Sequence, residues 1–269
     1  MGAHMKASVS ASEGQVMSSR QSEILKLVRE KGFVSSIELS RIFGVTPQTI
    51  RRDINELGEQ GFLSRYHGGV GNASSVENVA YATRRVLNQD AKNKIALEVA
   101  GDIPNKASIF LNIGTTTEAV ALALGNHKDL RVITNNLNVA AIMSEKEDFE
   151  VVVAGGVVRS RDRGIIGQAT IDFIRQFRVD FGIIGISGID LDGALLDFDY
   201  REVRVAQAII ENSRKVFLVA DHSKFGRSAM VKLGHVSQLD ALYTDKAPPA
   251  RLVELLKAEN VSLVVTSGM

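Results

Sequence analysis

Apolar residues recur at helical spacing close to the start of the chain. Within residues 20–31, Ile24, Leu25 and Val28 fall on one side of a helix, and Gly32 follows as a stop signal. An apolar stripe of this kind is typical of a helix that packs on a small core. The pattern therefore predicts a first helix over 20–31.

Two further helices are predicted after the first. Ser36 is a suitable N-cap for a short helix that ends before Gly44. Thr46 is a second N-cap, and Pro47 occupies the first position of a helix that should extend to about Gln60. Two helices joined by a tight turn that contains glycine form a helix-turn-helix.

A small β-hairpin is predicted directly after the third helix. Residues 62–66 have strand character and 67–69 (HGG) favour a turn, so together they predict a wing. The resulting winged helix-turn-helix spans 19–70. We expect a tag remnant followed by a flexible arm over 1–18, and a linker over 71–90, where the apolar pattern weakens.

From residue 91 onward, short apolar runs alternate with amphipathic stretches. Strands separated by helices of this length imply right-handed crossovers and a mainly parallel sheet. We therefore expect a Rossmann-like α/β domain over 91–269. The predicted strands are 108–112, 131–134, 150–154, 179–186, 216–220, 241–244 and 262–265. The predicted helices lie near 93–103, 117–125, 137–146, 168–177, 200–212 and 249–259.

The third helix has two faces of different chemistry. Ile50, Ile54 and Leu57 form one buried stripe, so the other face is free to carry polar groups. That face combines side chains that hydrogen-bond base edges with cations that contact phosphates, as a helix in the major groove requires. Alternatively, Arg51 and Arg52 only solvate a surface helix beside acidic neighbours. The candidate DNA-binding residues are Thr46, Gln48, Thr49, Arg51, Arg52 and Asn55, with Arg65 and His67 from the wing.

A loop of small residues follows the first strand of the α/β domain. Gly114 allows the backbone to approach a ligand, and Thr115, Thr116 and Thr117 supply hydroxyl groups just before a helix. The unpaired N–H groups of a helix N-terminus attract anions, so the loop is a candidate phosphate site. The alternative is that glycine and threonine here only cap a helix, as they do in many α/β turns.

Polar residues also follow later strands of this domain. The carboxyl ends of parallel strands lie along one edge of a sheet, and ligands bind there. Asn135, Asp190 and Asp221 each follow a predicted strand, and Lys224 lies just beyond Asp221. Lys224 is suited to pair with a phosphate, and the two aspartates to accept hydrogen bonds from ligand hydroxyls. Alternatively, Asp221 and Lys224 only pair with each other.

Composition excludes several classes of protein. The formal net charge is +1, so the case for DNA binding depends on local pattern and not on overall charge. There is no cysteine, which removes disulfides, thiol nucleophiles and cysteine-based zinc sites. His127, His222 and His235 are too scattered to predict a metal site. We expect a cytoplasmic protein, because no apolar run is long enough to span a bilayer. We expect no cofactor.

Two groups of motifs resemble the DeoR family. The segment from Val45 to Leu57 (VTPQTIRRDINEL) resembles its DNA-binding signature. In the second half, NNLNV from Asn135, FGIIGISGID ending at Asp190 and DHSKFGR from Asp221 resemble its effector domain. The resemblance implies a repressor released from operator DNA by a phosphorylated polyol or sugar, with glycerol 3-phosphate expected. It also implies a dimer or tetramer, and a fold similar to ribose-5-phosphate isomerases and CoA-transferases.

The resemblance assigns residues to the effector site. It places residues 114–117, Asp190, Asp221 and Lys224 there, and Lys92 is a further candidate because it lies just before the first predicted helix of the domain. The partners expected on these grounds are operator DNA, a small phosphorylated metabolite as inducer, and further copies of this chain.

An enzyme with a DNA-binding appendage is the alternative function. A phosphosugar isomerase or transferase needs a general base beside its substrate, and Asp190 is available for that role. Isomerases of the resembling fold carry a Lys-Gly-Gly-Gly stretch soon after this acidic segment, whereas residues 191–198 read LDGALLDF. The missing lysine and glycines favour a binding protein without turnover and without catalytic residues.

Overall fold

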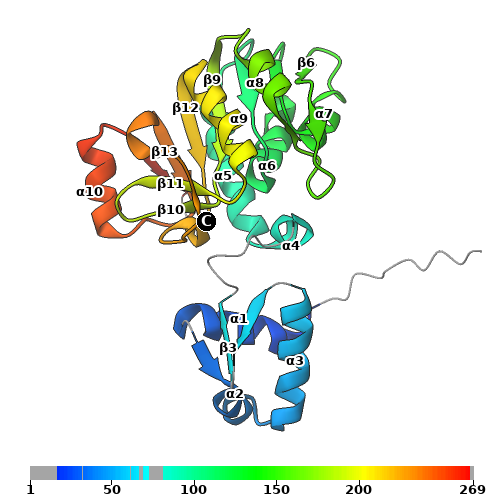
Figure 1. Ribbon diagram of the computed structural model, residues 1–269, viewed down its shortest axis with the longest axis vertical. Coiled ribbons are helices and arrows are strands. Elements are labelled where there is room, and N and C mark those ends of the chain that lie inside the picture. The colour runs from blue at the N-terminus through cyan, green and yellow to red at the C-terminus, as the bar shows by residue number, and fades with distance from the viewer. Residues whose placement is uncertain (1–16, 32, 61, 67–68, 73–80, 267–269) are drawn as a thin grey trace, which may run out of the picture. The chain divides into compact units, whose positions relative to one another are not determined.

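Two compact units make up the chain, residues 1–74 and residues 75–269 (Figure 1). Each unit has a hydrophobic core of its own. The computed structural model describes residues 17–31, 33–60, 62–66, 69–72 and 81–266.

The N-terminal unit is a winged helix-turn-helix, as predicted. Its core is formed by apolar side chains from all three helices, including Ile24, Leu39 and Leu57, which are fully buried. The wing strands form an antiparallel sheet in the order β1-β3-β2. The elements are α1 (Ser19–Lys31), β1 (Phe33–Ser35), α2 (Ser36–Phe43), α3 (Pro47–Glu59), β2 (Leu63–Tyr66) and β3 (Gly69–Asn72).

The turn between α2 and α3 follows from its local sequence. Gly44 ends α2 with φ of +61°, a left-handed conformation that glycine adopts without steric cost. The Thr46 hydroxyl caps α3 by accepting from the Thr49 N–H at 3.2 Å. At the start of α2 the prediction was wrong by one residue: Ser35, and not Ser36, accepts the capping hydrogen bond from the Glu38 N–H.

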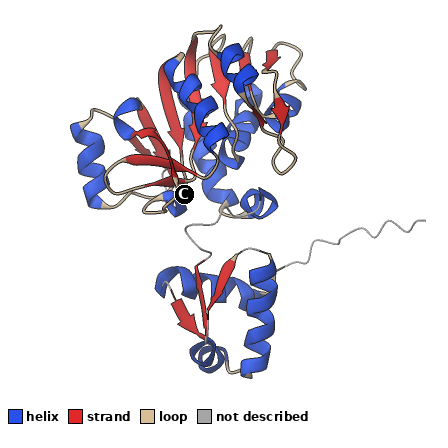
Figure 2. Ribbon diagram, in the orientation of Figure 1, coloured by secondary structure: helices blue, strands red, loops and turns tan. Residues whose placement is uncertain are grey.

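The C-terminal unit contains the predicted parallel sheet, and all seven predicted strands are present (Figure 2). Its order is β15-β14-β12-β9-β4-β5-β6, so the chain reverses its direction of travel across the sheet between β4 and β9. Loops at such a reversal diverge to opposite faces and leave room for a ligand. The strands are β4 (Ser108–Leu111), β5 (Arg131–Thr134), β6 (Glu150–Val153), β9 (Val179–Gly185), β12 (Ser213–Val219), β14 (Ala241–Thr244) and β15 (Ser262–Val265).

Helices cover both faces of this sheet. Side chains alternate along each strand, so Ile109 and Leu111 pack on one face while Phe110 packs on the other. The first face is covered by α5 (Gln89–Asp102), α6 (Thr115–Ala123) and α7 (Leu137–Met143). The second is covered by α8 (Gln168–Ile174), α9 (Tyr200–Glu211) and α10 (Ala250–Ala258).

Several short elements were not predicted. A hairpin joins β7 (Val157–Val158) to β8 (Ile165–Ile166). A second sheet contains β10 (Gly188–Ile189), β11 (Ala194–Asp197) and β13 (Val231–His235) in that order. Strands of two to five residues carry too few positions for a period-two pattern to be recognised.

Part of the segment for which we predicted a linker is helical. Residues 81–86 form α4 (Tyr81–Val86), and α5 begins at Gln89, earlier than predicted. The Tyr81 hydroxyl donates to the Glu118 carboxylate on α6, at 2.7 Å to Oε2. Residues 81–90 are therefore part of the C-terminal unit.

Candidate functional site

The solvent face of α3 presents the predicted polar side chains. Gln48, Arg51, Arg52 and Asn55 are all exposed, whereas Ile50 and its apolar companions on the other face are buried. Arg52 is held by an ion pair with Glu56 one turn later, with 3.0 Å between Nε and Oε1. The face thus offers amide and guanidinium groups in one stripe.

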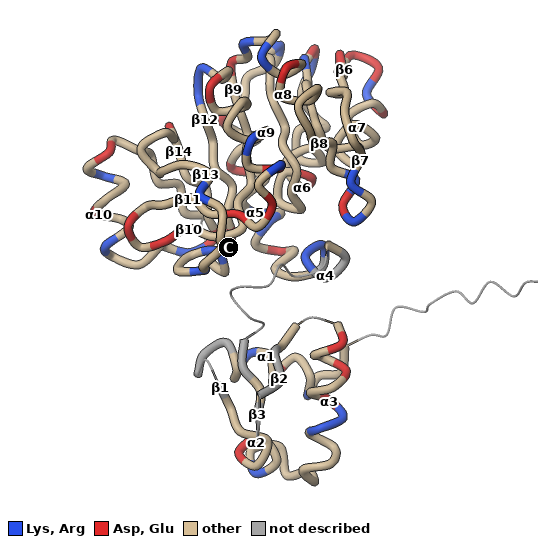
Figure 3. Tube along the Cα trace, viewed as in Figure 1, with Lys and Arg blue, Asp and Glu red and all other residues tan. Residues whose placement is uncertain are grey.

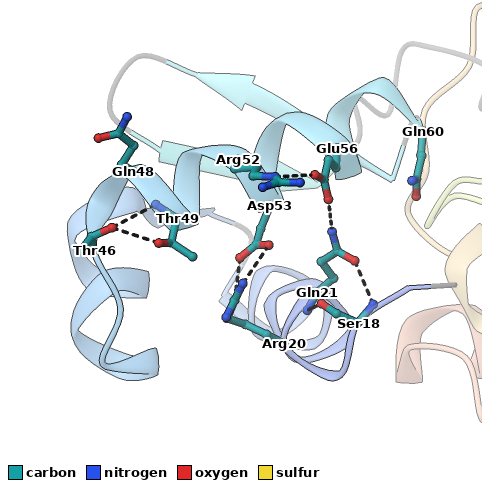
Figure 4. Close-up of a pocket in the computed structure, with 10 residues that line it drawn as sticks. All are labelled: Ser18, Arg20, Gln21, Thr46, Gln48, Thr49, Arg52, Asp53, Glu56 and Gln60. Atoms are coloured by element: carbon teal, nitrogen blue, oxygen red, sulfur yellow. Dashed lines mark hydrogen bonds and ion pairs between the residues drawn. The ribbon is translucent and has the colours of Figure 1, made fainter. Parts of the chain in front are cut away.

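Contacts between α1 and α3 hold this helix in place (Figure 4). Arg20 on α1 pairs with buried Asp53 on α3, and Gln21 donates to the Glu56 carboxylate at 2.7 Å. The surface-helix alternative has Asp53 and Glu56 as the local partners of the α3 arginines. Asp53 pairs instead with Arg20 on α1, whereas Glu56 does pair with Arg52. An open hollow of about 650 Å³ lies beside these contacts, bordered by residues of α1 and α3.

The other candidate DNA-binding residues are placed differently. Thr46 and Thr49 contact each other at the start of α3, with 2.9 Å between their hydroxyl oxygens, and so have a capping role already. Arg65 lies on β2, and only its backbone position is described. His67 lies outside the described residues.

In the C-terminal unit, the small-residue loop lies at the carboxyl end of β4, beside the point where the sheet reverses. The three threonines form the first turn of α6, which starts two residues earlier than predicted. Thr117 is fully buried, and its hydroxyl lies within hydrogen-bond distance of the Asn112 and Gly114 carbonyl oxygens, at 2.8 and 2.7 Å. Its side chain therefore shapes the loop, and Thr115 is the more accessible of the three hydroxyls.

Gly114 is required by the shape of this loop. Its φ of +153° is rarely adopted by residues with a side chain, and a Cβ there would lie 3.2 Å from Thr117 Oγ1. The neighbouring strand β9 also approaches closely, because the Gly185 Cα would be 4.0 Å from the same Cβ.

A buried aspartate, Asp221, lies close enough to a buried lysine, Lys92, to attract its positive charge. Asp221, after β12, accepts hydrogen bonds from the Asn88 side chain at 2.9 Å and from the Ser223 N–H at 3.0 Å. Lys92 on α5 is buried as well, and its ammonium group donates to the main-chain carbonyl of Arg84. Residues that are far apart in sequence are thus gathered at the carboxyl ends of β4, β9 and β12.

The pKa values in this cluster are shifted by burial and by neighbouring charges. Burial, together with repulsion from Lys224 and Arg84, lowers the pKa of Lys92 to about 8 against the attraction of Asp221. Burial also lowers the pKa of partly buried Lys224. Burial opposes ionisation of Asp221, but Lys224 and the Ser223 hydrogen bonds outweigh it, so the pKa of Asp221 is below its usual value.

Three charged residues here were missed by the sequence analysis. Arg84 on α4 repels both Lys92 and Lys224, and Arg227 after β12 repels Lys224, as the lowered pKa values of the two lysines reflect. Asp197 at the end of β11 is buried and accepts a hydrogen bond from the Ser187 hydroxyl at 3.0 Å, and burial raises its pKa. Arg227 is the last residue of the DHSKFGR segment that resembles the family, and this was a usable signal for it; Arg84 lay in the predicted linker.

Two predicted residues have other surroundings. Asn135 is buried; its Nδ2 donates to the Ile165 carbonyl at 3.0 Å, while its Oδ1 has no hydrogen-bond partner. Asp190 is exposed in the β10–β11 hairpin, where its carboxylate accepts from the Leu191 N–H at 2.7 Å. The contacts of Asp190 are thus local to its hairpin, because the chain turns away from the sheet after β9.

A buried network borders the cluster on the side of α9. Arg159 contacts Asp162 at 2.6 Å, Asp199 at 2.9 Å and Glu202 at 2.7 Å. Burial and the nearby Asp197 raise the pKa of Glu202 to about 7. Within the described part of the chain, no group of histidine and acidic side chains is arranged to hold a metal ion, and no helix is long and apolar enough to cross a membrane.

Comparison with known families matches both units. A DeoR-like helix-turn-helix domain matches residues 20–76, and a DeoR C-terminal sensor domain matches residues 87–246. Among solved structures, ribose 5-phosphate isomerase A from Neisseria gonorrhoeae is similar to part of the chain, with a TM-score of 0.37 and 16% identity over 50% of this chain and 52% of that one.

Relatives match along almost the whole length. The chain is 55% identical over 244 residues to the glycerol-3-phosphate regulon repressor of Escherichia coli, which covers 91% of this chain and 97% of the relative. It is 52% identical over 249 residues to the repressor of the same name from Haemophilus influenzae, covering 93% and 97%. These relatives are regulators and not enzymes. The chain therefore belongs to the DeoR family of transcriptional regulators.

Proposed function

We propose that this protein is a transcriptional repressor of a carbon-utilisation operon and that glycerol 3-phosphate releases it from its operator. The observation that carries the proposal is the identity of more than half of all aligned residues to glycerol-3-phosphate regulon repressors, across both the helix-turn-helix and the sensor domain. We place its action in the cytoplasm, where operator DNA is found.

The DNA-binding role rests on the solvent face of α3. Gln48, Arg51 and Asn55 are suited to base edges in the major groove, because amide and guanidinium groups match the donor and acceptor pattern found there. Arg52 is suited to a phosphate, and it must exchange its Glu56 partner to make that contact. The N-terminus of α3, with Thr46 and Thr49, lies against the DNA backbone in this arrangement, and Arg65 and His67 add contacts from the wing.

The effector role rests on the carboxyl ends of β4, β9 and β12. The first turn of α6 offers backbone N–H groups at Gly114, Thr115 and Thr116 to the phosphate, and Lys92 and Lys224 supply positive charge. The orphaned Asn135 Oδ1 and the Asp221 carboxylate are acceptors for ligand hydroxyls. Asp190 is left out of the proposed site, because its exposed carboxylate is used within its own hairpin.

Release requires that the effector prefers one arrangement of the protein. If glycerol 3-phosphate binds the DNA-incompetent arrangement more tightly than the DNA-competent one, this difference in affinity determines how far the equilibrium between the two arrangements shifts. We propose a dimer or tetramer as the binding species, because paired recognition helices read half-sites separated by whole helical turns.

The test is fluorescence anisotropy of a labelled promoter fragment bound by the full chain at fixed salt. Titration with glycerol 3-phosphate should lower the anisotropy, whereas glycerol should not. Binding that glycerol 3-phosphate leaves intact would contradict the proposed effector, and absence of specific binding would contradict the proposed repressor.

Lys224 provides a sharper form of the same test. Lys224→Ala should bind the operator normally but need about tenfold more glycerol 3-phosphate for half-release, because a charge-assisted contact to the phosphate is lost. Lys232→Ala is the matched control, since Lys232 is an exposed lysine on β13. Equal release of both variants would remove Lys224 from the proposed site.

A further inference from the structure

Arg84 on α4 has an unusual environment for an arginine. Its guanidinium is largely buried, with 18% of the side chain exposed, and the Nε is a buried donor without a hydrogen-bond partner. Its ion pair with Asp162 is long, at 3.8 Å between Nη2 and Oδ2. A buried N–H donor without a partner is costly, so its retention calls for an acceptor that fills the position.

The charges around Arg84 favour an anionic acceptor. Four basic side chains form what we call the cationic cluster (Arg84, Lys92, Lys224 and Arg227). Arg84 lies close enough to the other three to lower their pKa values. Facing them are Asp197 and Asp221, with Asp162 beside Arg84 and Glu118 near Lys92, and burial raises the pKa of Asp197. Asp162 is paired more closely with Arg159, at 2.6 Å, and Glu118 accepts from Tyr81. The four cations therefore outnumber the carboxylates left to neutralise them, which suits a doubly charged anion such as a phosphate monoester.

Helix α4 also contacts residues of α5, α6 and α7 that lie near the candidate effector site. The Lys92 ammonium donates to the Arg84 carbonyl, so a residue of the cluster holds the α4 backbone directly. One turn earlier, Tyr81 donates to Glu118 on α6, the helix whose first turn forms the candidate phosphate loop. The Asn138 side chain on α7 donates to the same tyrosine at 2.9 Å. Basic residues on α4 are visible in Figure 3.

The position of α4 in the chain gives these contacts a regulatory meaning. In sequence, residues 73–80 alone separate β3 of the DNA-binding unit from α4. A ligand that binds Arg84 therefore contacts α4, the first helix after the connection to the DNA-binding unit. A ligand held only by Lys224 and Asp221, after β12, has no such direct link.

We propose that Arg84 binds the effector's phosphate through its guanidinium, together with Lys92 and Lys224, so that effector binding acts directly on α4. This inference rests on the proposed function, since it names the residue through which the same effector is sensed. Arginine suits this role, because its planar fork of donors matches two oxygens of a phosphate, whereas lysine offers a point charge.

Arg84→Gln tests the inference in the full chain, with Arg85→Gln as its control. Arg85 is the exposed neighbour on the same helix, so the control makes the same chemical change without touching the cluster. Arg84→Gln should bind the operator normally but require at least about tenfold more glycerol 3-phosphate for half-release. Arg85→Gln should behave as the unchanged protein, and equal release of all three proteins overturns the inference while leaving the proposed function standing.

A second measurement separates the inference from the identity of the effector. Inorganic phosphate should raise the melting temperature of the unchanged protein and of Arg85→Gln, but not that of Arg84→Gln. This holds even if glycerol 3-phosphate does not release the operator, a result that would contradict only the proposed effector. An equal rise in all three proteins, or no rise in the unchanged protein, overturns the role of Arg84.

Two further variants cover a folding defect and the coupling to α4. If Arg84→Gln does not fold, Arg84→Lys retains the charge, and it should still bind phosphate more weakly than the unchanged protein; equal binding overturns the inference.

Because the chain has no cysteine, Arg85→Cys can carry a single fluorophore on α4. The emission of this fluorophore should change on addition of glycerol 3-phosphate. The change should be lost in the double variant that also carries Arg84→Gln, and a change that persists there overturns the proposed action of the effector on α4.

Discussion

Arg20 on α1 grips Asp53 on α3 with two hydrogen bonds, Nε to Oδ2 at 2.6 Å and Nη2 to Oδ1 at 3.2 Å. Asp53 is buried, and it directly follows the exposed Arg51 and Arg52 on α3. The contact orients α3 about its own axis and so decides which of its side chains face outward. It also raises the pKa of Arg20 through the hydrogen bond and the charge of Asp53.

Removal of this ion pair should loosen the recognition helix. Asp53→Asn leaves Arg20 without its charged partner, so we expect the melting temperature of the DNA-binding unit to fall by about 5 °C. Operator affinity should fall as well, because α3 is no longer held in a single orientation. Circular dichroism melting is the measurement, and Glu59→Gln, an exposed acid on the same helix, should have little effect. Equal melting of the two variants would show that the pair does not support the fold.

Arg51 is the arginine of α3 that we expect to matter most for operator recognition. Arg51→Ala should weaken specific binding by about 10- to 100-fold without lowering the melting temperature, because an exposed side chain that reads a base is lost. Arg52→Ala should cost less, since Arg52 gives up its Glu56 partner when it binds DNA. Anisotropy titrations of operator and scrambled fragments measure both. Lys26→Ala, an exposed change on α1, is the control, and an Arg51→Ala affinity equal to that of the control would refute the groove assignment.

The loop before α6 should not tolerate a side chain at its glycine. Gly114→Ala places a Cβ 3.2 Å from Thr117 Oγ1 at a φ of +153°, so the first turn of α6 must shift. We expect weaker binding of glycerol 3-phosphate by isothermal titration calorimetry, with operator binding retained. Gly101→Ala on α5 is the control, because nothing lies within 4 Å of the added Cβ. Unchanged affinity in Gly114→Ala would exclude this loop from the effector site.

Effector affinity should depend on pH through Lys92. Burial and its basic neighbours lower the pKa of this lysine to about 8, and a bound phosphate should raise it again. Above pH 8 the ligand-free protein must therefore take up a proton on binding. We expect affinity to fall about tenfold between pH 7 and pH 9, where the phosphate itself stays doubly charged because its second pKa is about 6.

Calorimetry in buffers of different ionisation enthalpy measures this proton uptake. The uptake should be reduced in Lys92→Met, and an affinity that is level from pH 7 to pH 9 would contradict the shift. The stability of the ligand-free protein should depend on pH in the opposite direction to effector affinity. Because the unfolded lysine binds the proton more tightly than the folded one, the free energy of unfolding should rise with pH between about 8 and the ordinary value of 10.5.

The elements of the fold were predictable because their signals are local. Helical stripes such as Ile50, Ile54 and Leu57, caps such as Thr46 and stop signals such as Gly44 depend on residues within one or two turns of each other. Inner strands of the central sheet such as β4 and β5 are apolar runs buried on both faces, and such runs are equally easy to recognise in the sequence. The family resemblance added the sensor domain and its expected ligand class.

The composition of the candidate effector site was decided by tertiary structure. Lys92, Asp221 and Lys224 were candidates from sequence, but only tertiary packing brings Arg84 of α4, Asp197 of β11 and Arg227 close to them. The same topology carries Asp190 out into a hairpin, although it follows a strand of the sheet. The sequence by itself determined which polar and charged residues follow the ends of the strands. Long-range packing decided which of these residues share a buried site, because burial and charge coupling act between residues that lie far apart along the chain.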